Sequence, residues 1–505
     1  MKAFDLHCHV SLKPMFQLPG ESRLNCWQTV SVVLDDPIGH IVDSQSNLSQ
    51  ISEGCCNLVC AALHPLEMKI ADRSLLHEVS YLMPKYVNRD QLKQIASGET
   101  PYLQLLKQEY ENLTRVMSNP DAKAGAAKSV KVLQSFRDYD PDDMETLHLL
   151  FSVEGAHAFY YGRNERDDVN RILHNLEQFV RSEQSPRLLY LTVTHLTQNV
   201  FCNHAFGIKI FDKDEFIPSG NGLQEAGREL IRKCYEELPY RLLIDTRHMS
   251  LKSRLMLYDF RRENGWNGIP LIASHAGVTG CSYRRMPERK VETHAEKNYI
   301  KVVYDKPEGH LPDTLFNPTS INLYDEDIAE ILLSGGLIGV SFDERILGAE
   351  VKLLIGQKAV EKEFVSVHES ELFCGEQVRA YEEEEHMEEE EDENSRSILR
   401  LNFHQLQELH LRHLVNTIFH IVKVGEELKE VDPWEHICIG SDFDGLINPI
   451  KACVSSSHFC ELPDKLKQAF EEYTPGAGFS VRNIEQVVEN IMFRNGYNFL
   501  KKHFL

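Results

Sequence analysis

The sequence predicts a closed parallel (β/α)8 barrel that carries large insertions. Eight short apolar runs, rich in β-branched or aromatic residues, are spread over the 505 residues, and eight is the number of strands that such a barrel requires. Segments with the periodicity of amphipathic helices lie between most of the runs, as expected of alternating strand and helix units. Five of the runs also have, at or near their ends, the histidines and carboxylates that are candidate ligands.

The predicted strands and helices follow one another along the whole chain. Apolar runs of this length, bounded by turn residues, favour strands. The predicted strands are residues 3–10, 57–64, 147–155, 188–196, 241–249, 270–277, 336–342 and 436–443. The predicted helices, placed by apolar residues at helical spacing, are residues 102–117, 169–179, 223–238, 328–333, 401–424 and 484–499.

Two intervals are too long for a minimal barrel, namely those between the second and third strands and between the seventh and eighth. The later interval contains residues 350–400, where residues 382–385 and 388–393 supply ten acidic side chains. Few aromatic residues accompany this run, so it cannot bury enough apolar surface to fold. We expect residues 1–505 to form a single barrel with an acidic, solvated and disordered insertion at 350–400. A charge run that tethers a partner is the alternative.

The overall charge narrows the class of partner. The chain has 77 Asp and Glu against 54 Lys and Arg, a formal net charge of −23, of which about −13 lies outside the acidic run. Binding to nucleic acid or to an anionic membrane surface needs clustered Lys and Arg. The composition therefore favours a small-molecule or peptide partner over nucleic acid or membrane. It leaves open whether the chain forms a homo-oligomer.

The cysteines indicate a reducing compartment. Twelve cysteines are scattered through the chain, and Cys8, Cys60 and Cys438 lie inside strand-like runs. No signal peptide precedes the first strand, and no apolar stretch approaches the roughly 20 residues of a membrane-spanning helix. We therefore expect reduced thiols in a soluble cytoplasmic protein. Cys55 and Cys56 lack the paired spacing of thiolate metal sites, which favours ordinary buried thiols.

Candidate metal ligands occur at the strand ends. His7 and His9 alternate along the first strand, so both imidazoles point to one face. Four further residues close later runs, namely Glu154, His248, His275 and Asp442. The carboxyl ends of barrel strands open onto one face, where these side chains converge. Imidazole and carboxylate suit zinc or a similar divalent ion, and a bridging carboxylate such as Glu154 could hold two ions about 3.5–4 Å apart.

The local motifs resemble those of a known family. In chain order they are Asp-x-His, Val-Glu-Gly-x-His, Leu-Thr-x-Thr-His-x-x-x-Asn, Leu-Ile-Asp-x-x-His-x-Ser, Ser-His, Arg-Arg-x-Pro and Gly-Ser-Asp-Phe-Asp-Gly. Together they resemble the membrane (renal) dipeptidase family of the amidohydrolase superfamily, over nearly the whole barrel. The resemblance implies a TIM barrel of the amidohydrolase type that binds two zinc ions and hydrolyses dipeptides.

The resemblance also implies which residues hold the metal. His7 would hold one ion, His248 and His275 the other, and Glu154 would bridge the two. The family usually has Asp where this chain has His9, so the first motif is closer to the His-x-His of the wider superfamily. We keep His9 as a predicted ligand. A neutral imidazole in place of a carboxylate makes the site one unit more positive, which favours hydroxide.

Three further residues would act on the substrate. By resemblance, His195 would polarise the substrate carbonyl or stabilise the oxyanion, Arg285 would bind the substrate carboxylate, and Asp442 would handle the amine and the proton transfers. The sequence thus predicts a zinc-dependent hydrolase, a dipeptidase in which a metal-bridging hydroxide attacks the amide carbonyl. The alternatives are an amidohydrolase acting on a lactone, cyclic amide or N-acyl amino acid, and a non-catalytic metal-binding scaffold.

Overall fold

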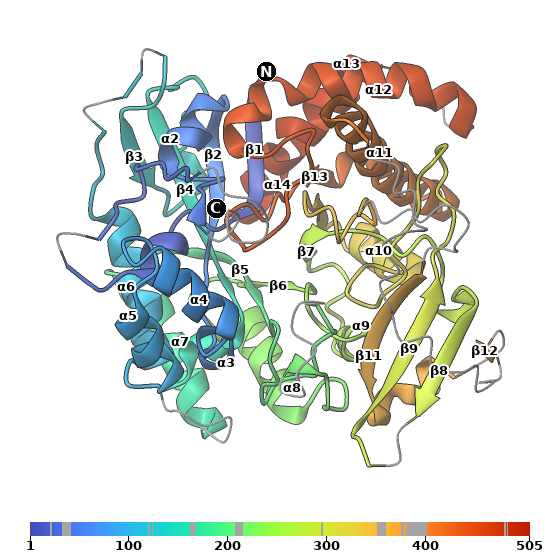
Figure 1. Ribbon diagram of the computed structural model, residues 1–505, viewed down its shortest axis with the longest axis horizontal. Helices are drawn as coiled ribbons and strands as arrows, with labels where there is room; N and C mark the ends of the chain where they lie inside the picture. Colours follow the sequence, from blue (N-terminus) through green and yellow to red (C-terminus); the bar gives the residue numbers. More distant parts are fainter. Residues whose placement is uncertain are drawn as a thin grey trace.

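Eight parallel strands form a closed barrel in the computed structural model (Figure 1). The structure describes residues 1–20, 23–32, 42–119, 122–123, 125–161, 168–207, 216–293, 296–350, 360–374, 378–379, 401–478, 481 and 483–505. The barrel strands are β1 (Ala3–Cys8), β2 (Cys56–Leu63), β4 (Thr146–Glu154), β5 (Leu188–Thr192), β6 (Leu243–Asp245), β7 (Leu271–Ala276), β10 (Leu337–Val340) and β13 (Ile437–Ile439). Each overlaps one predicted strand, so the predicted barrel is confirmed.

The ring closes because neighbouring strands pair in parallel all the way round. β1 pairs with β13 on one side and with β2 on the other, and the pairing of β2 with β4 completes the circle. A further strand, β3 (Ser129–Val132), pairs with the start of β4. All residues of β1 and β2 are buried. Strands covered on both faces are apolar throughout, which is why these strands stood out as continuous runs in the sequence.

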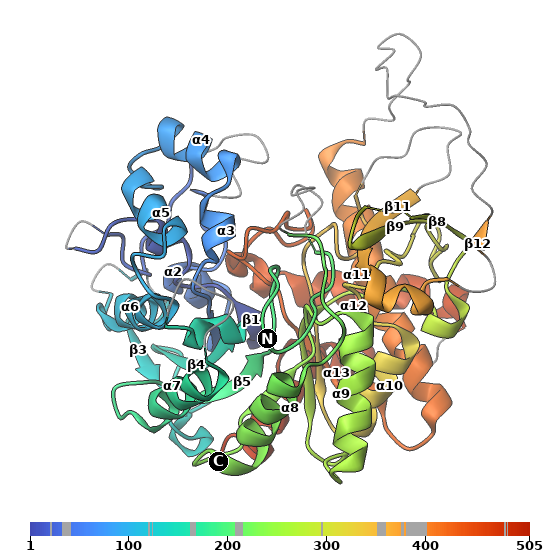
Figure 2. The same ribbon diagram turned by 90° about the horizontal axis from the view of Figure 1, so that it is seen from below.

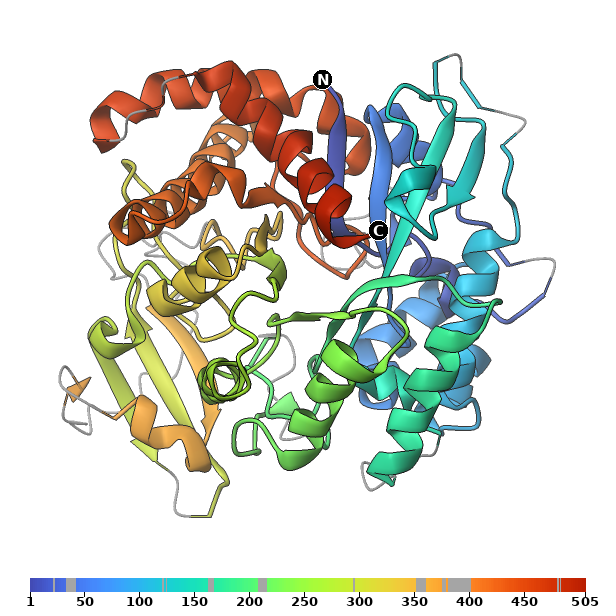
Figure 3. The same cartoon turned by 180° about the vertical axis from the view of Figure 1, so that it is seen from behind.

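Helices surround the barrel (Figure 3). They are α6 (Tyr102–Thr114), α7 (Val169–Arg181), α8 (Glu225–Arg232), α9 (Leu251–Glu263), α10 (Asp325–Leu333), α11 (Phe403–Leu428), α12 (Leu462–Ala477), α13 (Ile484–Glu489) and α14 (Asn495–His503). In α7, Ile172, Leu176 and Phe179 lie on one face and are buried, and Asp168 caps the first turn. Within the described ranges, no helix combines the length and apolarity needed to cross a membrane.

Two insertions stand on opposite sides of the barrel (Figure 2). Around β2, the chain adds α2 (Leu48–Glu53), α3 (Met68–Ala71), α4 (Ser74–Leu82) and α5 (Arg89–Ala96). The other insertion is a sheet of β8 (Arg289–Thr293), β9 (Tyr299–Asp305), β11 (Val360–Ser366) and β12 (Val378–Arg379), with its own apolar cluster. In the first insertion, α3, α4 and α5 lie between β2 and β4, an interval that the sequence marks as too long for a minimal barrel. The sheet was not predicted.

Part of the segment predicted to be a disordered acidic loop is folded. Within residues 350–400, β11 pairs with β9 over seven residues, and a 3-10 helix, η7 (Val367–Leu372), follows it. The expectation of a loop therefore does not hold for residues 360–372. This stretch pairs with a strand more than 50 residues earlier in the chain, which its own composition could not indicate. The acidic run at 382–393 lies outside the described residues.

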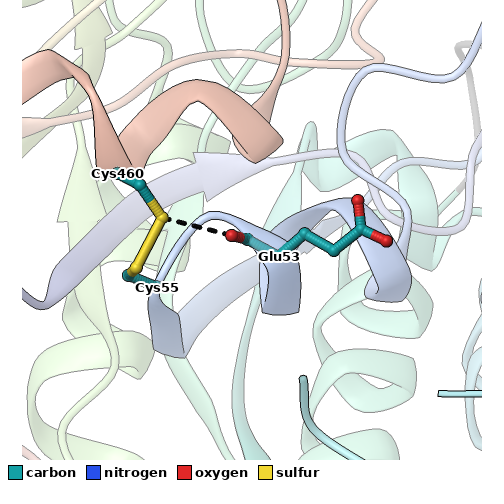
Figure 4. Close-up of a disulfide and its surroundings, with 3 residues drawn as sticks. All are labelled: Glu53, Cys55 and Cys460. Atoms are coloured by element: carbon teal, nitrogen blue, oxygen red, sulfur yellow. Dashed lines mark hydrogen bonds between the residues drawn. A yellow bond between two sulfur atoms is a disulfide. The ribbon is translucent and has the colours of Figure 1, made fainter. Parts of the chain in front are cut away.

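One cysteine pair departs from the expectation of reduced thiols. Cys55, directly before β2, forms a disulfide with Cys460, the last residue of the 3-10 helix η9 (Ser456–Cys460) (Figure 4). The expectation is wrong for this pair, because 405 residues separate the two cysteines in the sequence and only the fold brings them together. Disulfides persist mainly in oxidising compartments, so this pair counts against the predicted cytoplasmic location. Buried free thiols are confirmed at Cys8, Cys56, Cys60 and Cys438.

Candidate metal centre

The carboxyl ends of five barrel strands bring the predicted metal ligands together. His7 lies on β1, His275 lies on β7, and Glu154 is the last residue of β4. The remaining three follow strands: His9 comes directly after β1, and His248 and Asp442 come three residues after the ends of β6 and β13. All but Asp442 are buried, and the Asp442 side chain is 15% exposed.

The four imidazoles form two close pairs with Glu154 between them. The Nε2 atoms of His7 and His9 are 3.1 Å apart, and so are those of His248 and His275. Glu154 places one carboxylate oxygen 3.1 Å from His248 Nε2 and the other 3.3 Å from His9 Nε2. Two nitrogen ligands of a tetrahedral zinc ion at 2.0–2.1 Å are about 3.3 Å apart. The spacing therefore fits two neighbouring ions that share the Glu154 carboxylate.

Hydrogen bonds fix two of the imidazoles in the form that binds metal. Tyr190 donates its hydroxyl hydrogen to the backbone oxygen of Leu6, so its oxygen accepts from Nδ1 of His7 at 2.8 Å. Ser274 donates to Asp245 and therefore accepts from Nδ1 of His275 at 2.9 Å. In both rings the hydrogen is on Nδ1, which leaves the Nε2 lone pair directed at the centre.

Burial and neighbouring charges set the protonation of the four imidazoles. Burial lowers the pKa of His7 and His275 well below the usual range and that of His248 to about 3. These three imidazoles are neutral at pH 7, as metal ligands must be. Burial would also lower the pKa of His9, but hydrogen bonds to Asp442 and Glu154 raise it to about 10. The two carboxylates thus favour positive charge where His9 meets them.

Two of the predicted ligands have unusual backbone conformations. His248 and Asp442 have φ values of 64° and 62°, in the left-handed region that non-glycine residues rarely adopt. Such conformations cost of order 1–3 kcal/mol and persist only where the surroundings enforce them, typically at functional sites. A strained backbone at both residues supports their assignment to the site.

His195 lies at the edge of the centre and is held there by a residue that the sequence did not single out. Its Nδ1 is 2.6 Å from a carboxylate oxygen of Glu67, and its Nε2 is 3.7 Å from Glu154. The other Glu67 oxygen is 3.1 Å from Nε2 of His64. Burial would raise the pKa of Glu67, but His195 and His64 hold it well below its usual range. The short motif His-Pro-Leu-Glu after β2 is the sequence feature that could have indicated Glu67 as a site residue.

A cavity of about 110 Å³ opens onto the metal centre. Arg285, predicted to bind the substrate carboxylate, is exposed on the 3-10 helix η6 (Tyr283–Arg285) and is not among the residues that line this cavity. Two other arginines line it instead, Arg247 and Arg345. Asp343 pairs with Arg345 through both carboxylate oxygens, the closest nitrogen being 2.6 Å away.

Two neighbouring acids serve the scaffold. Asp5 accepts hydrogen bonds from the backbone of Ser441 and from its hydroxyl, which ties β1 to the loop that carries Asp442. Asp444 forms an ion pair with Lys13 at 2.7 Å and accepts from two backbone N–H groups of residues 45 and 46. Both acids therefore position the loops around the centre.

No family model matches the sequence, and no curated protein matches it. Among solved structures, dipeptidase AC, described as a metallo peptidase, is 15% identical and has a TM-score of 0.48, with 100% of this chain and 99% of that one covered. A metallo peptidase from Rhodobacter sphaeroides, solved with a phosphinate mimic of L-Ala-D-Ala, is 15% identical, has a TM-score of 0.46 and gives the same coverage. The probable dipeptidase PvdM from Pseudomonas aeruginosa is 13% identical with a TM-score of 0.48, covering 99% of this chain and 95% of its own.

Proposed function

We propose that the protein is a zinc-dependent dipeptidase that cleaves the amide bond of dipeptides or related small amides, with two ions per chain. The observation that carries this proposal is the arrangement of two imidazole pairs, each with Nε2 atoms 3.1 Å apart, on either side of Glu154. Borderline metals such as zinc suit imidazole and carboxylate ligands. The order of the motifs along the chain, which resembles that of the renal dipeptidase family, supports the same reaction.

The chain's own residues divide the work of amide hydrolysis. When bound, zinc ions supply a water of lowered pKa and polarise the substrate carbonyl. His195, held by Glu67 through Nδ1, presents Nε2 toward the centre. In the form that carries a hydrogen on both ring nitrogens, it donates from Nε2 to the carbonyl oxygen as negative charge develops there. Asp442 lines the cavity, takes up the proton of the attacking water and returns it to the leaving amine.

Metal analysis combined with a dipeptide library tests this proposal. We expect about two zinc ions per chain and cleavage of dipeptides that stops on chelation and returns with zinc. Bound metal without dipeptide cleavage would point to other amides or lactones, and a protein without metal would point to a scaffold. His275→Ala is expected to lose metal and activity. The control is His404→Ala, whose side chain is 77% exposed on α11.

A further inference from the structure

The cavity above the metal centre has an aliphatic wall. Ten of the 23 residues that line it are Leu or Ile, whereas the charged and imidazole side chains belong to the metal centre and its borders. Six of the aliphatic residues come from the segments that follow four barrel strands: Leu66, Ile70 and Leu75 after β2, Leu196 after β5, Ile346 after β10 and Leu446 after β13.

One residue of the aliphatic wall has a strained backbone. Leu446 has a φ of 63°, a left-handed conformation that a leucine rarely adopts, and its side chain lines the cavity. Ile321 and Ile346 form a small apolar cluster with Ala205, separate from the main core. These side chains surround the cavity and take no part in metal binding. Binding of an apolar ligand would remove both this surface and the ligand from water, which is favourable.

Arg247 supplies a charged group beside this wall. It lies directly before His248, is 4% exposed and lines the cavity. One terminal nitrogen donates to the backbone oxygen of Ile321, while its buried Nε has no hydrogen-bond partner among the described residues. A buried guanidinium with an unpaired donor is costly unless a ligand satisfies it. A carboxylate matches the guanidinium in charge and geometry.

We propose that the cavity selects amides that carry a long or branched aliphatic group and a free carboxylate, and that Arg247 binds the carboxylate. N-acyl amino acids with aliphatic chains and dipeptides with aliphatic side chains belong to this class. The proposal rests on the proposed function for the cleavage step. It does not rest on that function for binding, which a non-reacting ligand tests.

A chain-length series tests the aliphatic wall. The substrates are N-acetyl-, N-butanoyl-, N-hexanoyl- and N-octanoylglycine, assayed with the zinc-loaded protein. Burying one further CH2 is worth about fourfold, so kcat/KM should rise by about that factor per CH2 until the cavity is filled. A kcat/KM that is flat or falls with chain length would overturn the proposal.

Binding of acetate, butanoate, hexanoate and octanoate to the same protein, measured by calorimetry, separates this proposal from the proposed function. Affinity that rises with chain length while no amide is cleaved would sink the proposed function and support the selection. Cleavage without any effect of chain length in either assay would support the proposed function and refute the selection for aliphatic groups.

Two variants on one helix locate the apolar contact. Leu75 and Leu82 both belong to α4, but Leu75 lines the cavity whereas Leu82 is 59% exposed. Leu75→Ser should weaken octanoate binding by on the order of tenfold and leave acetate binding unchanged. Leu82→Ser should change neither. Equal losses for both carboxylates in Leu75→Ser would contradict a contact with the aliphatic chain.

The two arginines can be told apart by their effect on the carboxylate preference. We compare Leu-Gly with its C-terminal amide, which lacks the negative charge. Arg247→Gln should abolish the preference for the carboxylate, and Arg247→Lys should restore part of it. If Arg285→Gln abolished the preference instead, the carboxylate would be bound as the family resemblance implies, and the role of Arg247 would be refuted.

Discussion

Glu67 is the residue that joins the substrate side of the centre to its metal side. One of its oxygens is 2.6 Å from His195 and the other 3.1 Å from His64, whose second ring nitrogen is 3.0 Å from the backbone oxygen of Glu154. Glu67 is 1% exposed, and the neighbouring His195 and His64 compensate its charge. Carboxylates behind a functional imidazole hold its orientation and its tautomer.

We expect Glu67→Gln to lower kcat by about 10–100-fold while the metal content stays at its normal value, because Glu67 positions His195 and is not among the predicted ligands of the metal centre. Residues that act as a unit give non-additive losses. The double variant with His195→Ala should therefore be no slower than His195→Ala alone. Steady-state kinetics measure this, with the exposed Glu78→Gln on α4 as control. A fully additive double variant would show that the two residues act separately.

Glu154 lies between the two imidazole pairs and should control both ions together. We expect Glu154→Ala to lose both zinc ions and all measurable turnover, because each ion loses a carboxylate ligand at once. His248→Ala should lose mainly the ion of the His248 and His275 pair. Metal analysis by mass spectrometry after gel filtration distinguishes the two patterns. Full turnover of Glu154→Ala would show that the bridging role is wrong.

The added sheet, formed by β8, β9, β11 and β12, has a buried acid on its edge strand β11. Glu363 on β11 is fully buried and accepts hydrogen bonds from the hydroxyl of Tyr304 at 2.6 Å and from the backbone of Ser320 at 3.0 Å. Burial raises its pKa from 4.5 to about 7, although these hydrogen bonds lower it. The side chain joins the sheet to the loop before α10.

The pH dependence of stability should reveal this carboxyl. Its pKa is higher in the folded protein than in the unfolded chain, so its contribution to stability is fully present below pH 4.5 and is lost as the pH rises through about 7. Glu363→Gln imitates the neutral form at every pH. Its free energy of unfolding relative to the natural protein should therefore increase by about 3 kcal/mol between pH 4 and pH 8.

Urea unfolding at the two pH values measures this difference. The matched control is Glu292→Gln on β8, where the side chain is 22% exposed and pairs with Lys301 at 3.2 Å. The same pH-dependent gain in both variants would mean that the effect does not arise at Glu363.

The barrel strands could be predicted from sequence because both of their faces are buried and each forms a continuous apolar run. The added sheet has a weaker sequence pattern. In β9, buried residues alternate with half-buried ones, and charged residues such as Lys301 interrupt the apolar run. Its partner β11 comes more than 50 residues later, so the pairing depends on tertiary structure.

The same distinction applies to the candidate site. His7, Glu154 and His275 end apolar strands, so their positions on the barrel face follow from strand direction alone. Glu67 and Arg247 lie on loops, where the direction of a side chain depends on the path of the backbone. Arg285 shows the converse, since its motif matches a family pattern but the insertion places its side chain at the surface.

At the scale of the whole molecule, the disulfide between Cys55 and Cys460 lies far from the metal centre. Cys55 precedes the first residue of β2, at the amino end of the barrel. The eight residues of β2 span about 26 Å, and the predicted metal ligands lie at the carboxyl ends of the strands. In barrels of this type, residues at the amino end of the strands contribute to stability, whereas the active site lies at the carboxyl end.

We therefore expect Cys460→Ser to lower stability without altering metal content or kcat. The bond closes a loop of more than 400 residues, and losing a native disulfide typically costs about 2–5 kcal/mol because the unfolded chain gains freedom. For a chain of this length, that corresponds to a fall in Tm of roughly 2–5 °C. Differential scanning calorimetry measures it, and Cys374→Ser is the control because Cys374 is free and exposed.

Treatment with a thiol reductant should lower the Tm of the natural protein to that of Cys460→Ser and leave that variant unchanged. Equal Tm values for the natural protein and Cys460→Ser would mean that the bond does not form in solution, and a parallel loss of zinc would mean that the two ends of the barrel are coupled.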